Sequence, residues 1–330
     1  MTNKSSINRR TLLAWSAAGP ILPLLATPAA SQNTGRTIRI VVPFAAGGGN
    51  DVFARQIAQG LTELRGQSVV VDNKPGAGGN LGTELVVRSA PDGATLLLGH
   101  SGTLAINQSL YPKLGFNTQR DLMPLAMFAS SPLVLVVNPA LPAKTVSELI
   151  ALARARSGQI NYASSGSGTG AHLTGELFGL KSNTKIVHIP YKGTAPALTD
   201  VIGGQVQMMF SVVPAVLQHI ASGRLRALAV TSEKRLPGLP QVPTVAESGL
   251  PGFESSLTYG LLAPAGTPEA MVNELSAQIL KAAATPAFLE RLANEGAVAL
   301  AGGPAQFAAR IKAENIKWAE IVKISGATPD

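Results

Sequence analysis

The chain contains no cysteine, which excludes disulfides and thiolate metal sites. Aromatic residues make up only 5% of it and charged residues 14%. The net charge is +8, but aromatics are scarce and no cluster of basic residues is longer than Arg9-Arg10, so we expect no nucleic-acid partner. The 330 residues are 45% hydrophobic, enough for one large domain or for two lobes of ordinary size.

The N-terminal segment has the pattern of an export signal. Lys4, Arg9 and Arg10 precede an apolar stretch at residues 12–25, which is too short to cross a bilayer. Small residues at 27–31 follow, where a signal peptidase would cut. The residues around Arg9-Arg10 resemble a twin-arginine signal. We therefore predict a signal peptide at residues 1–31 and a periplasmic mature chain; a retained membrane anchor is the alternative.

The mature chain alternates apolar runs with amphipathic stretches, which is the pattern of an α/β protein with parallel strands and helices on both faces. The expected strands are 38–42, 69–71, 94–98, 133–137, 159–163, 185–189, 206–210, 225–230 and 257–263. The expected helices are 51–64, 80–89, one that begins after Thr145, 170–180, 194–202, 214–222, 268–283, 286–295 and 304–324. A long surface connection is expected at 236–253, which is rich in proline and glycine.

Two βα series followed by further helices predict two lobes. We expect residues 32–130 and 257–330 to form lobe 1 and residues 131–256 to form lobe 2. The chain would then cross between the lobes near 130 and near 256, and paired crossings of this kind form a hinge that closes on a ligand.

A glycine-rich loop between the first strand and the first helix is the strongest candidate for an anion site. Backbone N–H groups of such a loop face an anion, and the helix dipole adds favourable charge. The candidate residues are Phe44, Ala45, Gly47, Gly48, Gly49, Asn50 and Asp51. The loop lacks the Gly-Lys-Ser/Thr sequence that ends a P-loop, so it is not a P-loop. The alternative role of Asp51 is to cap the helix.

A second loop occupies the equivalent position of the second series. Its candidate residues are Ser164, Ser165, Gly166, Gly168 and Thr169, which offer N–H and hydroxyl donors. The spacing differs from G-x-G-x-x-G because Ala171 follows the glycines at 166, 168 and 170. The strand that ends at Pro190 lacks the acidic residue that would hold a ribose, so a nucleotide cofactor is not expected.

A third turn, Gly99 to Thr103, follows the third strand. A nucleophile elbow would require glycine where Thr103 stands. Ser101 and Thr103 either donate to a ligand or satisfy the turn itself.

The four histidines, His100, His172, His188 and His219, show no metal-ligand spacing. We include His172 among the ligand-binding candidates, with a surface pair to Glu176 as the alternative. Neither a Ser/His/Asp set nor a carboxylate pair is evident, so we expect no catalytic residue, no metal and no cofactor.

Eight segments, in this order, resemble the Bug-type family, the periplasmic receptors of tripartite tricarboxylate transporters. They are IRIVVPFAAGGGND, VVVDNKPGAGGNLG, APDGATLLLG, INYASSGSGTGAHLTGELF, VHIPYKGTAPALTDVIGGQVQMMF, GRLRALAVTSEKR, PQVPTVAESGLPGFE and GLLAPAGTP. The resemblance extends from about Arg39 to the C-terminus.

The resemblance implies a two-lobed periplasmic-binding-protein (venus-flytrap) fold, each lobe a sheet flanked by helices, and no catalysis. It implies that the two glycine-rich loops grip a carboxylate of a small organic acid. It also implies membrane components of a tripartite transporter as partners, and we expect the receptor to be a monomer. Many members carry an acidic residue after the Met-Phe of QVQMMF, where this chain has Ser211. We include Ser211 as a ligand-binding candidate; its alternative is to cap the following helix.

Two other functions remain open from the sequence. One is a sensor subunit that presents the bound carboxylate to a membrane histidine kinase. The other is an exported hydrolase that uses one of the serine-rich loops, which the lack of a base–nucleophile motif disfavours.

Overall fold

The structure, a computed structural model, describes residues 37–191 and 193–329. The predicted signal peptide lies outside the described residues. The strands are β1 (Ile38–Val42), β2 (Val69–Asn73), β3 (Thr95–His100), β4 (Leu122–Val137), β5 (Ile160–Ser164), β6 (Ile186–Pro190), β7 (Met208–Val212), β8 (Arg226–Val230), β9 (Ser256–Pro264) and β10 (Val298–Gly302). The helices are α1 (Gly49–Arg65), α2 (Asn80–Val87), α3 (Asn107–Leu110), α4 (Thr118–Asp121), α5 (Val146–Ala155), α6 (Gly170–Ser182), α7 (Thr194–Ile202), α8 (Val213–Ala221), α9 (Glu269–Ala283), α10 (Pro286–Asn294) and α11 (Pro304–Ser325), with a 3-10 turn η1 (Ala77–Gly79) and a π-helical turn η2 (Gly102–Ile106).

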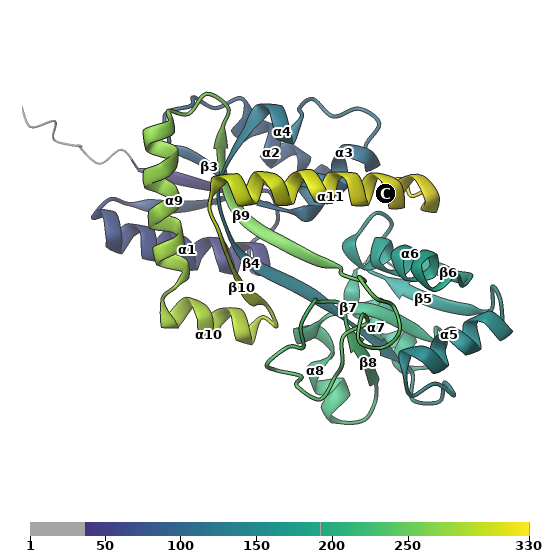
Figure 1. Ribbon diagram of the computed structural model, residues 1–330. Helices are drawn as coiled ribbons and strands as arrows, with labels where there is room; N and C mark the ends of the chain where they lie inside the picture. Colours follow the sequence, from purple (N-terminus) through teal and green to yellow (C-terminus); the bar gives the residue numbers. More distant parts are fainter. Residues whose placement is uncertain (1–36, 192, 330) are drawn as a thin grey trace, which may run out of the picture. The chain divides into compact units, whose positions relative to one another are not determined.

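The described strands join in the order β2-β1-β3-β9-β4-β7-β5-β6, and β8 and β10 also pair with β4. The long strand β4 divides this arrangement. Its residues 122–132 pair with β9, whereas its residues 133–137 pair with β7 and β8. We call β1, β2, β3, β9, β10 and residues 122–132 the first sheet segment, and β5 to β8 with residues 133–137 the second (Figure 1).

The expectation of a parallel sheet is wrong for the centre of the molecule, where the sheet is mixed. Strands β1, β2 and β3 are parallel, as are β5, β6 and β7. Strands β4 and β9 carry the chain between the two segments in opposite directions. They therefore pair antiparallel with each other, and β9 pairs antiparallel with β3 and β4 with β7.

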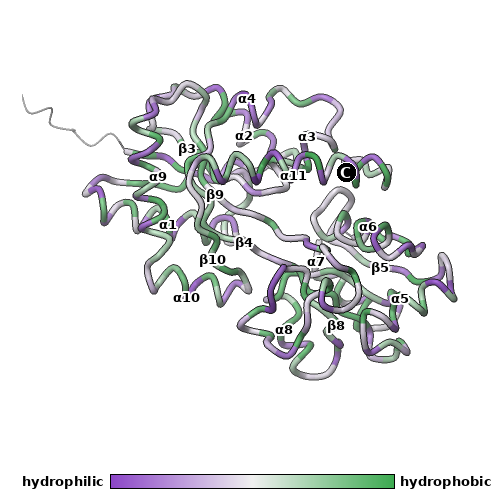
Figure 2. Tube along the Cα trace, viewed as in Figure 1, coloured by the Kyte–Doolittle hydropathy of each residue, from purple (hydrophilic) through white to green (hydrophobic). Residues whose placement is uncertain are grey.

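Each sheet segment has its own apolar core. Buried residues of β1, β3, α1 and α9 form one cluster, and buried residues of β4, β5, α5 and α6 form another. Trp318, Ile321 and Val322 of α11 belong to the second cluster, although the beginning of α11 packs with the first segment. Helix α11 therefore spans both segments, with apolar and polar residues interspersed along it (Figure 2).

The long connection between β8 and β9 contains no regular helix or strand, as predicted. It is not a wholly exposed loop, because Leu236, Leu239, Val245 and Phe253 are buried. Within the described ranges, no helix is long and apolar enough to cross a membrane.

Candidate functional site

The first glycine-rich loop is closed by a carboxylate of the helix that follows it. The N–H of Gly47, which has φ +87°, donates to Oδ2 of Asp51 at 3.0 Å. The same oxygen accepts from Nε of Arg55 at 2.9 Å. Burial raises the pKa of Asp51, but the hydrogen bonds from Arg55 and Gly47 outweigh this and leave the pKa below its usual value. Asp51 is thus a charged, buried group that shapes the loop.

At the start of the first glycine-rich loop, the ring of Phe44 packs against a histidine. Phe44 stacks on His100, with ring centroids 4.8 Å apart. Burial lowers the pKa of His100 to about 4, so the ring is neutral at physiological pH. Its Nδ1 accepts from the N–H of Gly102 at 2.8 Å. The ring proton is therefore on Nε2, which makes His100 a neutral hydrogen-bond donor.

A third glycine-rich segment, Gly76 to Gly79, has positive φ at all four residues. A Cβ at Gly78 would lie 2.5 Å from the Tyr111 hydroxyl, so only glycine fits there. Nδ2 of Asn107 donates to the carbonyl of Gly78 at 3.0 Å. This segment is held against α3 by these contacts.

The turn with Ser101 and Thr103 is satisfied internally. Oγ of Ser101 accepts from the N–H of Thr258 at 2.8 Å, and Oγ1 of Thr103 donates to the carbonyl of His100 at 3.1 Å. Both side chains are almost fully buried. The structure favours the turn-forming alternative for both residues.

The second loop is folded on itself by its hydroxyl groups. Oγ of Ser164 bonds to both the N–H and the carbonyl of Gly166. Oγ1 of Thr169 donates to the same carbonyl at 2.8 Å and accepts from the N–H of His172 at 3.3 Å, which caps α6. Gly166 and Gly168 have positive φ. Hydroxyl contacts and glycine conformations together define the loop.

His172 lies beneath this loop and is 5% exposed. Its Nδ1 accepts from the N–H of Gly168 at 2.9 Å. Its ring stacks on His188, with centroids 3.7 Å apart and planes 8° from parallel. His172 supports the loop and does not line the cavities described next.

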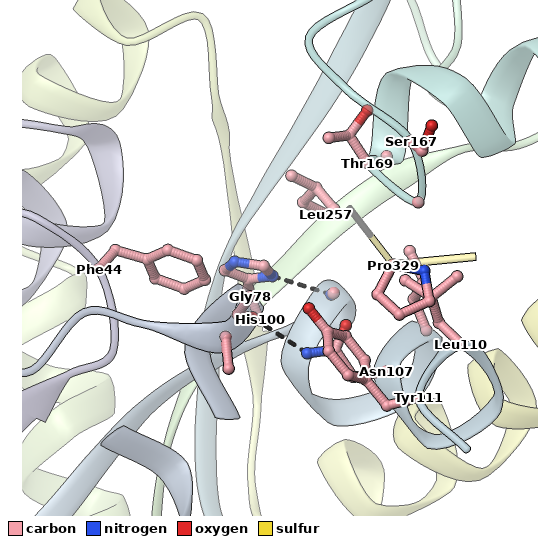
Figure 3. A pocket seen from close by; sticks show the side chains of 15 residues that line it. Phe44, Gly78, His100, Asn107, Leu110, Tyr111, Ser167, Thr169, Leu257 and Pro329 are labelled. Carbon is pink, nitrogen blue, oxygen red and sulfur yellow. Dashed lines mark hydrogen bonds between the residues drawn. The ribbon is translucent and has the colours of Figure 1, made fainter. Parts of the chain in front are cut away.

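The candidate site has two adjoining cavities, and the larger of the two has a volume of about 440 Å³ (Figure 3). Phe44, Gly78, His100, Asn107 and Tyr111 line it from one side. The loop from Ser167 to Gly170 lines it from the other, with Leu257 and Pro329 completing the wall.

A cavity of about 190 Å³, the smaller cavity, shares Thr169, Gly170 and Leu257 with the larger one. Ser165, Thr194 and Ser211 add hydroxyl groups, and Leu133, Met209 and Phe210 add apolar surface. Ser211 is 2% exposed, at the end of β7. We call the two cavities together the cleft. Among the described residues that line the cleft, no side chain carries a formal charge.

The structure thus brings five of the candidate residues to the cleft and places the others elsewhere. Those that line it are Phe44, Ser165, Gly168, Thr169 and Ser211. Ala45, Gly47 and Gly48 are exposed, Gly49 and Asn50 are half-buried, and Asp51, Ser101, Thr103, Ser164, Gly166 and His172 make or support turns around the cleft.

Sequence reasoning missed several cleft residues, above all His100, Gly78, Asn107 and Tyr111. The run that contains Gly78 was a detectable sign, because it is rich in glycine like the two loops that were singled out. Nothing in the sequence distinguishes Asn107 or Tyr111 from their neighbours in the chain.

A serine–histidine contact exists, but its geometry does not suit a nucleophile. Oγ of Ser164 lies 2.6 Å from Nε2 of His188. Ser164 is fully buried and its hydroxyl already bonds to Gly166, so a substrate has no access to it. In the part of the chain that the structure describes, no group of three His, Asp or Glu side chains is arranged to hold a metal ion.

The α/β fold thus presents a cleft lined by neutral hydrogen-bond donors, an arrangement suited to holding a small solute. Residues 53–326 match the model of the tripartite tricarboxylate transporter family receptor. The chain belongs to this family.

Three comparisons show how close the relatives are. The chain is 42% identical to BugT of Bordetella pertussis over 293 residues, which cover 88% of this chain and 90% of BugT. Rpa4515 of R. palustris, solved with adipate, is 35% identical with a TM-score of 0.75, covering 89% of this chain and 98% of that one. MatC from Rhodopseudomonas palustris, solved with bound malate, is 32% identical with a TM-score of 0.71, covering 87% and 98%.

The matched family is a family of transporter receptors, which confirms the interpretation of this chain as a binding protein and not an enzyme. The α/β fold class with helices flanking the sheet, inferred from the resemblance, is confirmed as well.

Proposed function

We propose that this protein captures a small organic carboxylate in the periplasm for uptake by a tripartite tricarboxylate-type transporter. The observation that carries the proposal is the cleft between the two glycine-rich sides, which offers neutral donors in place of charged side chains. Helix α6 begins at Gly170 and helix α7 at Thr194, and both residues line the smaller cavity. Helix N-termini favour anions through their free N–H groups and their dipole.

The shape of the cleft supports a ligand with two ends. The larger and smaller cavities meet at Thr169, Gly170 and Leu257, so a molecule that occupies both would pass these residues. Adipate and malate, which the two relatives bind, each have a carboxylate at both ends. We propose a dicarboxylate, or a monocarboxylate with an apolar end that packs on Leu133, Met209 and Phe210.

Ser211 supports a further restriction. An acid at this position would favour an ammonium group on the ligand and repel a second carboxylate. Serine is neutral and either donates or accepts a hydrogen bond. We propose that the ligand is a carboxylic acid without an amino group.

We also propose that ligand binding closes two lobes, 32–130 with 257–330 and 131–256. The change of pairing partners of β4 after Pro132 and the start of β9 at Ser256 support hinge points near 130 and 256. Small-angle scattering should give a smaller radius of gyration when a ligand binds. An unchanged radius with saturating ligand would argue for a rigid cleft.

Export through residues 1–31 is the proposed route to the periplasm. Intact mass of the protein from a periplasmic extract should place the mature N-terminus between Ala30 and Asn33. A retained segment 12–25 in the membrane fraction would contradict it.

We propose a monomer that docks with the membrane components of the transporter, and size-exclusion chromatography with light scattering tests the monomer.

The experiment that tests the function is native mass spectrometry of the protein released from the periplasm. A mass excess that disappears on denaturation and matches an organic acid is the expected result. Growth of a deletion strain on that acid then separates transport from sensing by a histidine kinase. Loss of uptake supports transport, whereas intact uptake with lost gene induction supports the sensor.

A further inference from the structure

Two histidines hold the two ends of the second glycine-rich loop. His188 contacts the start of the loop, where its Nε2 lies 2.6 Å from Oγ of Ser164. His172 contacts the other end, where its Nδ1 accepts from the N–H of Gly168. The two imidazole rings stack face to face, 3.7 Å apart. The loop between Ser164 and Gly168 is therefore fastened at both ends to one two-ring stack.

The contact to Gly168 defines the protonation state of His172. A ring nitrogen that accepts from an N–H carries no proton, so Nδ1 of His172 is unprotonated and the ring is neutral. Protonation would place an N–H against the N–H of Gly168 and break this bond. Two charged rings at 3.7 Å would also repel each other strongly, so the stack does not accept two protons together.

Among the described residues, the titratable side chains in contact with the pair include Glu176 and Tyr162. Nε2 of His172 lies 3.8 Å from Oε1 of Glu176 on the same helix. The Tyr162 hydroxyl, from β5, donates to the same carboxylate oxygen at 2.5 Å, and the Tyr162 ring lies over His188 with centroids 5.0 Å apart. Burial and the nearby Glu176 raise the pKa of Tyr162, so it stays protonated. Glu176 is the one carboxylate in contact with His172 among the described residues, and it favours a proton on Nε2.

The loop held in this way forms part of both cavities. Gly168 lines the larger cavity, Ser165 lines the smaller one, and Thr169 lines both. A change at the two fastened ends therefore changes the wall of the cleft.

We propose that His172 and His188 are positioning residues that hold the second loop in its binding shape only while the stacked pair is neutral, so that ligand affinity falls as the pair takes up a proton. The proposal rests on the proposed function, because it concerns the same cleft. It reassigns His172 from a ligand contact to a support of the loop.

The other two histidines allow a specific test. Burial holds the pKa of His100 at about 4, so this ring does not titrate between pH 5.5 and 8. His219 is on α8 and lines neither cavity. A change of affinity in this pH range that disappears in His172→Asn would therefore point to the stacked pair, because protonation of the acid itself would affect every variant alike. His219→Asn is the matched control.

The variants are His172→Asn and His172→Ala. Asparagine Oδ1 occupies nearly the position of Nδ1, so it accepts from Gly168 but does not titrate; alanine leaves that N–H without an acceptor. Calorimetry with malate and with adipate should show affinity for the wild type that falls between pH 8 and pH 5.5. At pH 8 His172→Ala should bind roughly tenfold more weakly, as expected for one lost hydrogen bond. At pH 8 His172→Asn should bind within about twofold of the wild type, and it should keep only the pH dependence that protonation of the acid itself causes.

A ligand-free measurement keeps this test independent of the choice of acid. Nitrogen-15 NMR of the full mature protein should show Nδ1 of His172 unprotonated at pH 7.5, and amide exchange at Gly168 should speed up in His172→Ala beyond the effect of His219→Asn. A protonated Nδ1, or equal exchange in both variants, overturns the positioning role. Binding of neither acid, with these NMR results as expected, would count against the dicarboxylate part of the proposed function and not against the role of His172.

Discussion

The N–H of Gly47 and the carboxylate of Asp51 are joined by a 3.0 Å hydrogen bond that turns the first glycine-rich loop back onto α1. Arg55 binds the same oxygen from one helical turn further on, and Asp51 is nearly buried. From the sequence, Asp51 is either a helix cap or a ligand contact. In the structure, its carboxylate holds the first loop closed.

Asp51→Ala should loosen the first loop and weaken ligand binding. It removes the acceptor of Gly47 and the partner of Arg55, and charge-assisted hydrogen bonds of this kind contribute about 1.5–3 kcal/mol. We expect a lower melting temperature by calorimetry and about tenfold weaker binding by titration. Asp51→Asn keeps an acceptor for Gly47 and should lose less of both. Equal losses in the two variants would show that the charge, and not the bond to Gly47, is what matters.

Gly48→Val should weaken binding without unfolding the protein. Gly48 has extended backbone angles, φ −83° and ψ 170°, which valine adopts without strain, and the nearest atom to an added Cβ is 4.0 Å away. The side chain would fill open space beside the first loop, where we expect an anion to approach. Gly238→Val is the matched control, since it also projects into open space but lies in the connection before β9. Gly48 does not line the cleft, so this effect requires that closure of the lobes brings the first loop onto the bound ligand. Unchanged affinity in Gly48→Val would mean that closure does not bring the first loop onto the ligand.

The fold was largely predictable because the strands of both sheet segments are short apolar runs separated by helices of clear period. Strand β10 and residues 122–132 of β4 were not predicted. Pro124 and Pro132 interrupt β4, and its pairing with β9 shifts register twice, so it lacks the regular pattern of a strand. The antiparallel centre follows from long-range pairing of β4 with β9, which no local pattern encodes.

The candidate site was predictable where glycine and hydroxyl residues cluster, as at Ser165 and Thr169. It was not predictable where a residue reaches the cleft through tertiary packing. His100 is a buried, neutral donor only because Phe44 and the rest of the fold exclude water from it. His172 was expected at the ligand, but the structure places it under the loop.

Ser211→Asp should shift the ligand preference. Ser211 is buried in the smaller cavity, so a carboxylate there would repel the second carboxylate of a bound diacid. We expect at least tenfold weaker binding of adipate or malate and new stabilisation by aspartate or glutamate in a thermal-shift panel. Gln218→Glu, which adds the same charge on the exposed side of α8, should leave the panel unchanged. Stabilisation of the wild type by aspartate or glutamate alone would contradict the inference from Ser211.

Glu254 should make the fold sensitive to acid. Its carboxylate binds Lys317 at 3.0 Å and Arg310 at 3.2 Å, so it ties the connection before β9 to α11. Burial raises the pKa of Glu254, but Lys317 and Arg310 outweigh this and leave it lowered. Because the folded pKa lies below the unfolded one, the stabilisation is present above about pH 4.5 and is lost as the pH falls through the folded pKa.

Glu254→Gln should therefore lower the melting temperature at pH 7 and make it fall less steeply than that of the wild type between pH 5 and pH 3. Glu290→Gln, at an exposed position of α10, is the control and should follow the wild type. If the melting temperatures of all three proteins fall in parallel as the pH is lowered, the ion pairs of Glu254 contribute nothing to the stability of the fold.

The most direct test of the central claim is a crystal structure of the protein with the acid that accompanies it from the periplasm. The account predicts a carboxylate in the cleft, within hydrogen-bond distance of the second loop at Ser165 to Gly170 and facing His100 across the cavity. A carboxylate bound elsewhere on the protein, with the cleft filled only by water, would contradict it.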